Sequence, residues 1–460
     1  MTDYLSNLPI ELIDKILNDV PSFDILKSLC LDLLFISSSL KYLCLHLVNF
    51  HDISRIDLRG EQISSIENLI LGNISMNLSH IYSITPSLRT LDTTINPYYF
   101  NCTEHFFPPQ QLRQLSIKLF HGFRFSTIER LLYQMTSLVQ LTIIAYNIYN
   151  SEIDGVAWEQ ILTNIITFKF LFRFHEKTWN QEPIGLEMFS TPFWLENKHW
   201  HIQYDRCTVS GFSLLYTTPY IDDTYPWEYI KGPIITKSPG PQILSFPNIN
   251  HLLVTSTSPT NTEILYRFTK LQQLFVKDIG KSFYVLLNDI VPYIDISNIT
   301  EFSINSHFPI DSHYSKLSGD FIVKFLFTMS HLRSISVPID FLKLLFLYRW
   351  PNINRLEISF HICPAAARTQ KQITSDEIDI LYYSFNHIEY IEFDYELDVN
   401  IIKLINNIPI TICCIVIYQP VNVTADTFDG FITREWLEQN TRLCNFLYSC
   451  NKQNTVTLWV

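Results

Sequence analysis

Glycine is scarce in this chain of 460 residues, at 11 residues, which argues against folds built on glycine-rich phosphate loops. Neither the dinucleotide pattern G-x-G-x-x-G nor the P-loop pattern G-x-x-x-x-G-K-[ST] occurs. Charged residues reach only 17%, below the ~25% of typical globular proteins. Hydrophobic residues make up 47%, so the chain can bury a large core and is not disordered by composition.

Basic side chains are the minority charge, with 33 Lys and Arg against 45 Asp and Glu and a net charge of −12. Nucleic-acid binders and membrane-surface helices usually carry the opposite charge, and no Lys/Arg-rich run is present. We therefore expect neither nucleic acid nor a membrane as partner. The uncharged run 404–425 is long enough to span a bilayer. Its apolar part, 408–418, is rich in β-branched residues and bounded by prolines, which predicts a buried strand.

Export signals and metal motifs are also missing. Asp3, Glu11, Asp14 and Asp19 interrupt the uncharged stretch that a secretory signal needs, so we expect a cytoplasmic or nuclear location. The nine cysteines are scattered without C-x-x-C, which fits a reducing compartment and gives no zinc spacing. We expect no cofactor.

Catalytic constellations are absent as well: the chain contains no H-E-x-x-H, no G-x-S-x-G, no kinase signature and no EF-hand loop. Three weaker candidates are an acidic cluster (Asp376, Glu377, Asp379), an acidic pair (Asp222, Asp223) and a histidine pair (His199, His201). The acidic cluster follows Thr374, so a helix start is favoured over a metal site. A solvated loop is favoured for Asp222 and Asp223. We therefore expect no enzymatic activity.

A short unit, apolar-x-x-apolar-x-apolar, recurs along the chain after residue 50. Its second half alternates like a strand, and helix-like stretches such as 127–135 and 321–329 lie between the units. Within each of two blocks the starts are 21 to 35 residues apart. The units begin at Ile53, Leu88, Leu112, Leu138, Ile249, Leu271, Ile299, Leu332, Ile353 and Ile388.

A strand and a helix at this spacing resemble the leucine-rich repeat family. That family places Asn or Cys three residues after the last apolar position to link successive turns, whereas here the slot holds residues such as Glu61, Tyr146, Thr257 and Ile279. The predicted fold is therefore α/β, an irregular leucine-rich-repeat-like solenoid of strand–helix units. It comprises a first block at 51–174 and a second block with a C-terminal cap at 247–460.

The segment 175–246 between the blocks holds half of the eight tryptophans and seven prolines. Because proline breaks helices and central strands, we expect a loop-rich insertion with two or three strands, one at Leu214–Thr218. Two interpretations are open: the aromatic residues plug a joint between the blocks, or they form the recognition surface. Tyr and Trp dominate binding hot spots, so the second interpretation predicts substrate contacts by Tyr216, Tyr220, Tyr225 and Trp227.

Residues 1–50 have a different period. The first apolar stripe lies between Pro9 and Pro21, and two further stretches, 25–30 and 40–48, repeat helical spacing. This pattern predicts a compact unit of three helices. The apolar stripe of the first helix consists of Leu12, Ile13, Ile16, Leu17 and Val20.

The run Leu8-Pro9-Ile10-Glu11, followed by Ile16-Leu17 and a second helix at 24–29, resembles an F-box over residues 5–50. The basic pair that the family carries in its third helix is missing here. The resemblance implies docking on a Skp-type adaptor and, through it, a cullin–RING ubiquitin ligase. Leu8 and Pro9 would wedge into the adaptor, and its apolar helices would be covered by Ile13, Ile16 and Leu17.

Two functions follow from these observations. The first is a substrate-recognition adaptor of a Skp–cullin–F-box ubiquitin ligase, which holds an unknown protein substrate on the repeat region. The alternative is a leucine-rich-repeat-like interaction scaffold without a link to ubiquitin, in which the N-terminal residues merely cap the first repeat.

Overall fold

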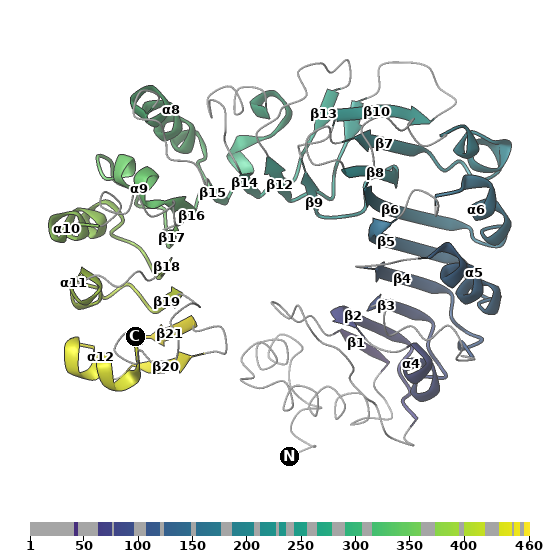
Figure 1. Cartoon of the computed structure of the whole chain (residues 1–460), viewed down its shortest axis with the longest axis horizontal. Helices are drawn as coiled ribbons and strands as arrows, with labels where there is room; N and C mark the ends of the chain where they lie inside the picture. The colour runs from purple at the N-terminus through teal and green to yellow at the C-terminus, as the bar shows by residue number, and fades with distance from the viewer. Residues whose placement is uncertain are drawn as a thin grey trace. The chain divides into compact units, whose positions relative to one another are not determined.

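The computed structural model describes eighteen stretches of the chain, and the segment with the F-box resemblance lies outside them apart from four residues. The described residues are 41–44, 63–75, 78–95, 107–119, 124–148, 153–175, 186–206, 212–226, 230–235, 243–254, 265–277, 290–305, 315–359, 373–394, 400–418, 432–443, 446–450 and 455–460. The chain divides into two compact units, Met1–Ile221 with Tyr229–Gly240 and Asp222–Glu228 with Pro241–Val460. The predicted mixed α/β class is confirmed by two large, mostly parallel sheets (Figure 1).

The first unit is built on a sheet with the strand order β1-β2-β3-β4-β5-β6-β8-β7-β10. From β1 to β6 the strands are parallel and follow chain order, and β8, β7 and β10 continue antiparallel. The strands are β1 (Tyr42–Cys44), β2 (Asn68–Ser75), β3 (Thr90–Ile95), β4 (Gln114–Leu119), β5 (Gln140–Ile148), β6 (Thr167–His175), β7 (Ile202–Arg206), β8 (Phe212–Thr217) and β10 (Ile230–Ile235). The connections include α4 (Leu78–Ile84), α5 (Phe125–Gln134), α6 (Gly155–Ile161), η3 (Leu186–Phe189) and η4 (Phe193–Asn197).

The second unit is built on a sheet with the order β20-β21-β19-β18-β17-β16-β15-β14-β12-β9, parallel from β9 to β19 and antiparallel at β21 and β20. Its strands are β9 (Thr224–Pro226), β12 (His251–Val254), β14 (Gln273–Lys277), β15 (Glu301–Asn305), β16 (Ser334–Pro338), β17 (Arg355–Ser359), β18 (Tyr390–Asp394), β19 (Cys414–Tyr418), β20 (Leu447–Cys450) and β21 (Thr455–Trp459). A separate parallel pair joins β11 (Ile243–Ser245) and β13 (Leu265–Arg267). The helical elements are η5 (Val291–Tyr293), η6 (Ile296–Asn298), α8 (Ser315–Thr328), α9 (Ile339–Leu345), α10 (Ser375–Ser384), α11 (Asn400–Asn406) and α12 (Arg434–Asn440).

The predicted repeat units coincide with the parallel strands. All nine units that fall on described residues run into a strand, and their middle apolar residues lie opposite one another in register. Three further units, which were not predicted from the sequence, lead into β2, β6 and β19 in the same way. They start at Ile66, Ile165 and Ile412. The aligned row in the second unit is at most 1% exposed and consists of Leu252, Leu274, Phe302, Ile335, Leu356, Ile391 and Ile415.

A backbone pattern links each parallel strand to the next. One carbonyl oxygen just before or at a strand start accepts two successive N–H groups from the next strand start, at 2.7–3.2 Å. For example, the N–H groups of Arg113 and Gln114 both donate to the oxygen of Arg89. We call each residue that supplies such a carbonyl a rung. The rungs are Lys41, Glu67, Arg89, Arg113 and Val139 in the first unit and Asp223, Asn250, Gln272, Thr300, Arg333, Asn354 and Glu389 in the second.

The helix predicted over 40–48 is wrong at its centre, because Tyr42–Cys44 is strand β1. Leu43 pairs with Leu69 of β2 and is 6% exposed. Leu40, Leu43 and Leu45 also fit the apolar-x-x-apolar-x-apolar unit of the repeats. Joining a parallel ladder satisfies the backbone groups of this segment, and tertiary pairing overrides its helical spacing.

The segment 175–246 contains more strands than the two or three expected. Besides β8, which overlaps the predicted Leu214–Thr218, it holds β7, β9, β10 and β11. It is divided between the units, since β7, β8 and β10 extend the first sheet and β9 belongs to the second. Antiparallel strands need only short turns, and Pro233 is tolerated because β10 is an edge strand.

The described part of the uncharged run, 404–418, holds the end of α11 and strand β19. Its C-terminal apolar part is β19, whose central residues Ile415, Val416 and Ile417 are buried, so the predicted buried strand is confirmed there. Among the described residues, no helix is long and apolar enough to cross a membrane.

The aligned apolar row should carry much of the stability of the second unit. Ile391 is fully buried, so Ile391→Ala should destabilise the unit by about 2–5 kcal/mol and lower Tm by several degrees. Ile410 is fully exposed, and Ile410→Ala is the matched control with a change below about 0.5 kcal/mol. Thermal unfolding followed by circular dichroism measures both. Equal effects of the two substitutions would contradict the assigned register.

Candidate functional site

The second unit has a polar groove along the starts of β15 to β18. Two adjoining hollows, of about 480 and 440 Å³, share Arg333 and Asn354. The lining residues are Asn298, Thr300, Glu301, His331, Arg333, Ser334, Asn354 and Arg355 in the first hollow and Arg333, Pro351, Asn352, Asn354, His387, Glu389 and Thr411 in the second. We call these residues together the strand-start groove.

The rungs explain why polar side chains gather in this groove. The carbonyl groups of Thr300, Arg333 and Asn354 are engaged in the backbone ladder, while the side chains of these rungs line the hollows. Asn354 Nδ2 donates to Glu389 Oε2 at 3.4 Å, and His331 Nδ1 lies 2.7 Å from the carbonyl oxygen of Ser297. Amide side chains both donate and accept. The groove therefore offers partners to an extended peptide backbone.

Beside the groove, Arg355, Tyr390 and Glu392 form a charged cluster on the strand face opposite the aligned apolar row. Arg355 Nη2 lies 3.5 Å from Glu392 Oε2, and the Tyr390 hydroxyl donates to the same oxygen at 2.5 Å. The guanidinium of Arg355 lies 4.4 Å from the centre of the Tyr390 ring. Glu392 is only 6% exposed, and its buried carboxyl group is paired with these two neighbours.

The Tyr390 hydroxyl of this cluster and the nearby Cys414 thiol are poor nucleophiles. Burial and the hydrogen bond to Glu392 raise the pKa of the Tyr390 hydroxyl. Burial, followed by the neighbouring Cys413 and Glu392, raises the pKa of the Cys414 thiol to about 11. Since the thiolate is the reactive form of cysteine, Cys414 is protonated at neutral pH.

The acidic pair and His199 of the histidine pair each make hydrogen bonds within their own segment. Asp222 Oδ1 accepts from the Asp223 N–H at 2.9 Å, and Asp223 Oδ1 accepts from the Thr224 hydroxyl at 3.0 Å, within the turn before β9. His199 Nδ1 lies 3.1 Å from the carbonyl oxygen of Leu195. Throughout the described stretches, no three His, Cys, Asp or Glu side chains are placed to hold a metal ion.

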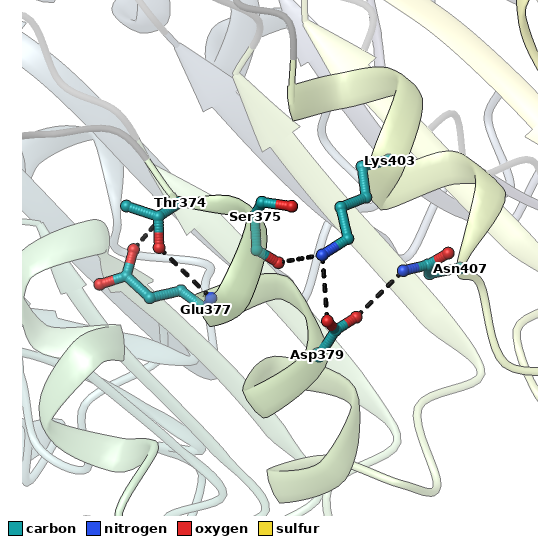
Figure 2. Close-up of polar contacts among 6 residues, drawn as sticks. All are labelled: Thr374, Ser375, Glu377, Asp379, Lys403 and Asn407. Carbon is teal, nitrogen blue, oxygen red and sulfur yellow. Dashed lines mark hydrogen bonds and ion pairs between the residues drawn. The ribbon is translucent and has the colours of Figure 1, made fainter.

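The acidic cluster at 376–379 starts helix α10, as its position after Thr374 predicts. Figure 2 shows the capping box: Thr374 Oγ1 accepts from the Glu377 N–H at 3.3 Å, and Glu377 Oε2 accepts from the Thr374 N–H at 2.7 Å. Glu377 also pairs with Lys343 of α9 at 3.0 Å. Burial alone would raise the pKa of Glu377, but the hydrogen bonds from Thr374 and Lys343 lower it overall.

The third acid of the cluster links α10 to the next helix. Asp379 accepts from Lys403 Nζ and from Asn407 Nδ2, each at 3.0 Å, and Lys403 also donates to the carbonyl oxygen of Ser375 (Figure 2). The hydrogen bond from Lys403 is the main cause that lowers the pKa of the Asp379 carboxyl. Three successive helices, α9, α10 and α11, are thereby joined by ion pairs.

Three of the four aromatic residues proposed for substrate contact are described, and all three are buried. Tyr216, Tyr220 and Tyr225 are 1%, 3% and 1% exposed. Tyr216 and Tyr220 pack edge to face at 4.9 Å in the first unit, and Tyr225 packs on Phe246 at 5.1 Å in the second. Trp227 lies outside the described residues. The burial of the three tyrosines favours the packing interpretation over the recognition interpretation, since each contributes to the core of its own unit.

Tyr216 also belongs to a buried polar network that the sequence did not reveal. Its hydroxyl donates to Asp205 Oδ2 at 2.7 Å, and Gln203 Nε2 donates to Asp205 Oδ1 at 2.7 Å. Asp205 and Gln203 are fully buried. The alternation of apolar and polar residues in β7 resembles a half-solvated strand, so sequence pattern alone could not indicate their burial.

The docking residues Leu8, Pro9, Ile13, Ile16 and Leu17 all lie outside the described residues, and their role stays a prediction. The strand-start groove was missed because its side chains come from four separate repeats and, with Thr411, from the start of a fifth. The available signal was the polar residue at each rung of this block, such as Arg333, Asn354 and Glu389.

Comparison with known proteins adds one likeness. No protein-family model matches the chain, and no curated protein matches it. A solved structure, the crystal structure of a Rad7 and Elc1 complex in yeast, is similar at 13% sequence identity with a TM-score of 0.33. The match covers 86% of this chain and 86% of that chain. A TM-score of this size does not establish a shared fold.

The ion pair of Asp379 should make the helix layer sensitive to acid. A carboxylate with a lowered folded-state pKa stabilises the fold at neutral pH and loses that contribution as the pH falls through the folded-state value. Asp379→Asn should therefore lower Tm slightly at pH 7, and the difference should begin to shrink near the ordinary Asp pKa of about 3.9 and vanish below the folded-state pKa. Differential scanning calorimetry across pH measures this. In a Lys403→Met background the same substitution should show a weaker pH dependence, since only the hydrogen bond from Asn407 is left to lower the pKa of Asp379.

The packing interpretation of the tyrosines predicts a loss of stability. Tyr216→Phe keeps the ring but removes the donor to the buried Asp205, which should cost about 1–3 kcal/mol. Tyr133 is 63% exposed, so Tyr133→Phe is the matched control and should leave Tm unchanged. A stable Tyr216→Phe variant that loses a bound partner would restore the recognition interpretation.

Proposed function

We propose that the chain is a substrate-recognition adaptor of a Skp–cullin–F-box ubiquitin ligase. The observation that carries this proposal is the run Leu8-Pro9-Ile10-Glu11 with its following apolar helix, placed ahead of repeated strand–helix units. In this role the F-box docks on a Skp-type adaptor, and the chain binds a protein substrate without catalysis of its own. The proposed location is the cytoplasm or the nucleus.

The proposed architecture is an F-box followed by an irregular leucine-rich-repeat-like solenoid. Its support is the chain-ordered parallel strands, the helices between them and the regular series of rungs. Repeats of this kind contact mainly their neighbours and present extended surfaces for binding. The strand-start groove is the proposed contact surface for a substrate in the second unit, because it offers amide, hydroxyl and charged side chains along four strands.

Strand β1 limits the length of the N-terminal docking segment in this proposal. The F-box-like motifs occupy residues 5–17 and 24–29, and β1 starts at Tyr42. A unit of two helices and part of a third therefore precedes the sheet in this proposal. The sequence positions at which the F-box family carries its basic pair also precede β1.

One observation favours the alternative function, an interaction scaffold without a link to ubiquitin. Leu43 is paired with Leu69 in the first sheet, so the N-terminal segment leads directly into the edge of the repeats. A segment in that place could serve as a cap that covers apolar surface of the terminal repeat. Copurification with a Skp-type adaptor separates the two functions.

The docking proposal predicts a specific loss of adaptor binding. Leu8→Ala with Pro9→Ala should weaken binding of a purified Skp-type adaptor by about 2–4 kcal/mol, because interface anchors of this kind carry most of the binding energy. Isothermal titration calorimetry on the full chain measures the affinity. The control is Leu347→Ala with Pro351→Ala, which alters an exposed leucine and proline of the second unit.

The affinities are compared only if both variants have the same Tm as the unaltered chain. Unchanged affinity in Leu8→Ala with Pro9→Ala, or no adaptor binding by the unaltered chain, would contradict the ubiquitin-ligase role. The scaffold alternative would then be retained.

A further inference from the structure

The first four rungs of the first unit form a row of mostly basic side chains: Lys41, Glu67, Arg89 and Arg113. Backbone hydrogen bonds of 2.7–3.0 Å join each rung to the next, so the four residues occupy adjacent strand starts. Lys41 and Arg89 have side chains that are 57% and 58% exposed, and Arg113 is also exposed. We call these four residues the basic row.

The single carboxylate in the basic row holds its neighbours in place. Glu67 Oε1 lies 3.0 Å from Lys41 Nζ, and Glu67 Oε2 lies 3.2 Å from Arg89 Nε. The hydrogen bond from Lys41, with Arg89 adding to it, lowers the pKa of the Glu67 carboxyl, so this group stays charged. Arg113 Nη1 donates to the carbonyl oxygen of Ser137 at 3.1 Å. Three cations against one anion leave a local charge of +2.

This local charge contrasts with the whole chain and with the second unit. The chain carries −12 overall, and the corresponding rungs Arg333, Asn354 and Glu389 of the strand-start groove carry no net charge. A basic row on an acidic protein attracts acidic groups locally while the rest of the surface repels them. The attraction therefore depends on position rather than on net charge.

The ladder continues beyond the basic row with apolar residues. The next rung is Val139, and its oxygen accepts from the N–H groups of Ile166 and Thr167. Val139 is partly exposed and Ile166 is 71% exposed. Neighbouring strands are ~4.8 Å apart, so the basic row spans ~14 Å and the apolar pair follows within a further ~10 Å.

We propose that the basic row and the adjoining Val139 and Ile166 bind an extended acidic segment of a partner protein that ends in apolar side chains. Carboxylates of the segment meet Lys41, Arg89 and Arg113, and its apolar end covers Ile166. About four or five extended residues match the length of the basic row. The proposal does not require the ubiquitin-ligase role, since the observations behind it are the charges and contacts of the basic row.

A nucleic acid is a less suitable occupant of the same row. Its phosphates would meet the Glu67 carboxylate in the middle of the cations, and the apolar pair would contribute nothing to backbone binding. A peptide can place a neutral side chain opposite Glu67. The hydroxyl and amide groups of Thr90, Gln114 and Gln140 at the same strand starts can hydrogen-bond its backbone.

The test uses the full chain and a fluorescein-labelled peptide of consecutive glutamates followed by leucines. Arg89→Glu with Arg113→Glu should weaken binding in fluorescence anisotropy at least about tenfold. Arg89→Gln with Arg113→Gln should weaken it less and avoids new repulsion against Glu67. The matched control is Lys270→Glu with Lys324→Glu, two exposed cations of the second unit that lie outside the strand-start groove and give the same change in net charge. It should stay within about twofold of the unaltered chain.

Two further measurements address the chemistry of the partner. Raising the salt concentration should weaken binding of the peptide. Ile166→Ser should weaken binding of the leucine-bearing peptide but not of a glutamate-only peptide. The proposal is overturned if the unaltered chain does not bind the peptide, or if the glutamine variant binds it as tightly as the unaltered chain. It is also overturned if the control loses as much affinity as the reversed pair, or if a single-stranded oligonucleotide binds more tightly through Arg89 and Arg113.

Discussion

The structure depends on one backbone interaction, a carbonyl that accepts two successive N–H groups from the next strand start. It recurs at every parallel junction described between β1 and β6 and between β9 and β19. Because it involves only backbone atoms, it sets the register whatever the side chain and whatever the length of the connection. Leu252 to Ile415 align in one buried row although their units start 21 to 35 residues apart. In the leucine-rich repeat family, Asn or Cys side chains link successive turns, whereas here the backbone ladder links successive strands.

A backbone ladder leaves the side chains at the rungs available for recognition. Mutation of a rung side chain does not remove the hydrogen bonds that hold the strands, so these positions can vary in charge while the fold is kept. In the first unit they carry Lys41, Arg89 and Arg113, and in the second Arg333, Asn354 and Glu389. The same position in the repeat thus provides a basic row in one unit and a polar groove in the other. Cys414 and Tyr390, with raised pKa values, add no nucleophile to the groove.

The strands could be predicted from the sequence where one apolar unit stands between polar residues, as at Leu115 and Leu356. The repeat units at Ile165 and Ile412 were missed because further apolar residues stand beside them, at Leu171–Phe172 and at Val416, and hide the spacing, although a buried strand was expected over 408–418. In the proline-rich segment 175–246 only β8 was placed in advance, and the burial of Tyr216 could not be known because it depends on Asp205 of a neighbouring strand. The groove joins residues from separate repeats, a proximity that only the register reveals.

The spacing of the rungs limits what each surface can recognise. Successive rungs are ~4.8 Å apart, whereas side chains on one face of an extended peptide repeat every ~6.6 Å. A peptide that crosses the strands therefore meets a rung with only some of its side chains. Each exposed ion pair contributes little by itself. Selectivity in the first unit must then come from the order of groups along the ladder, in which Glu67 excludes a continuous anion and Ile166 requires an apolar end.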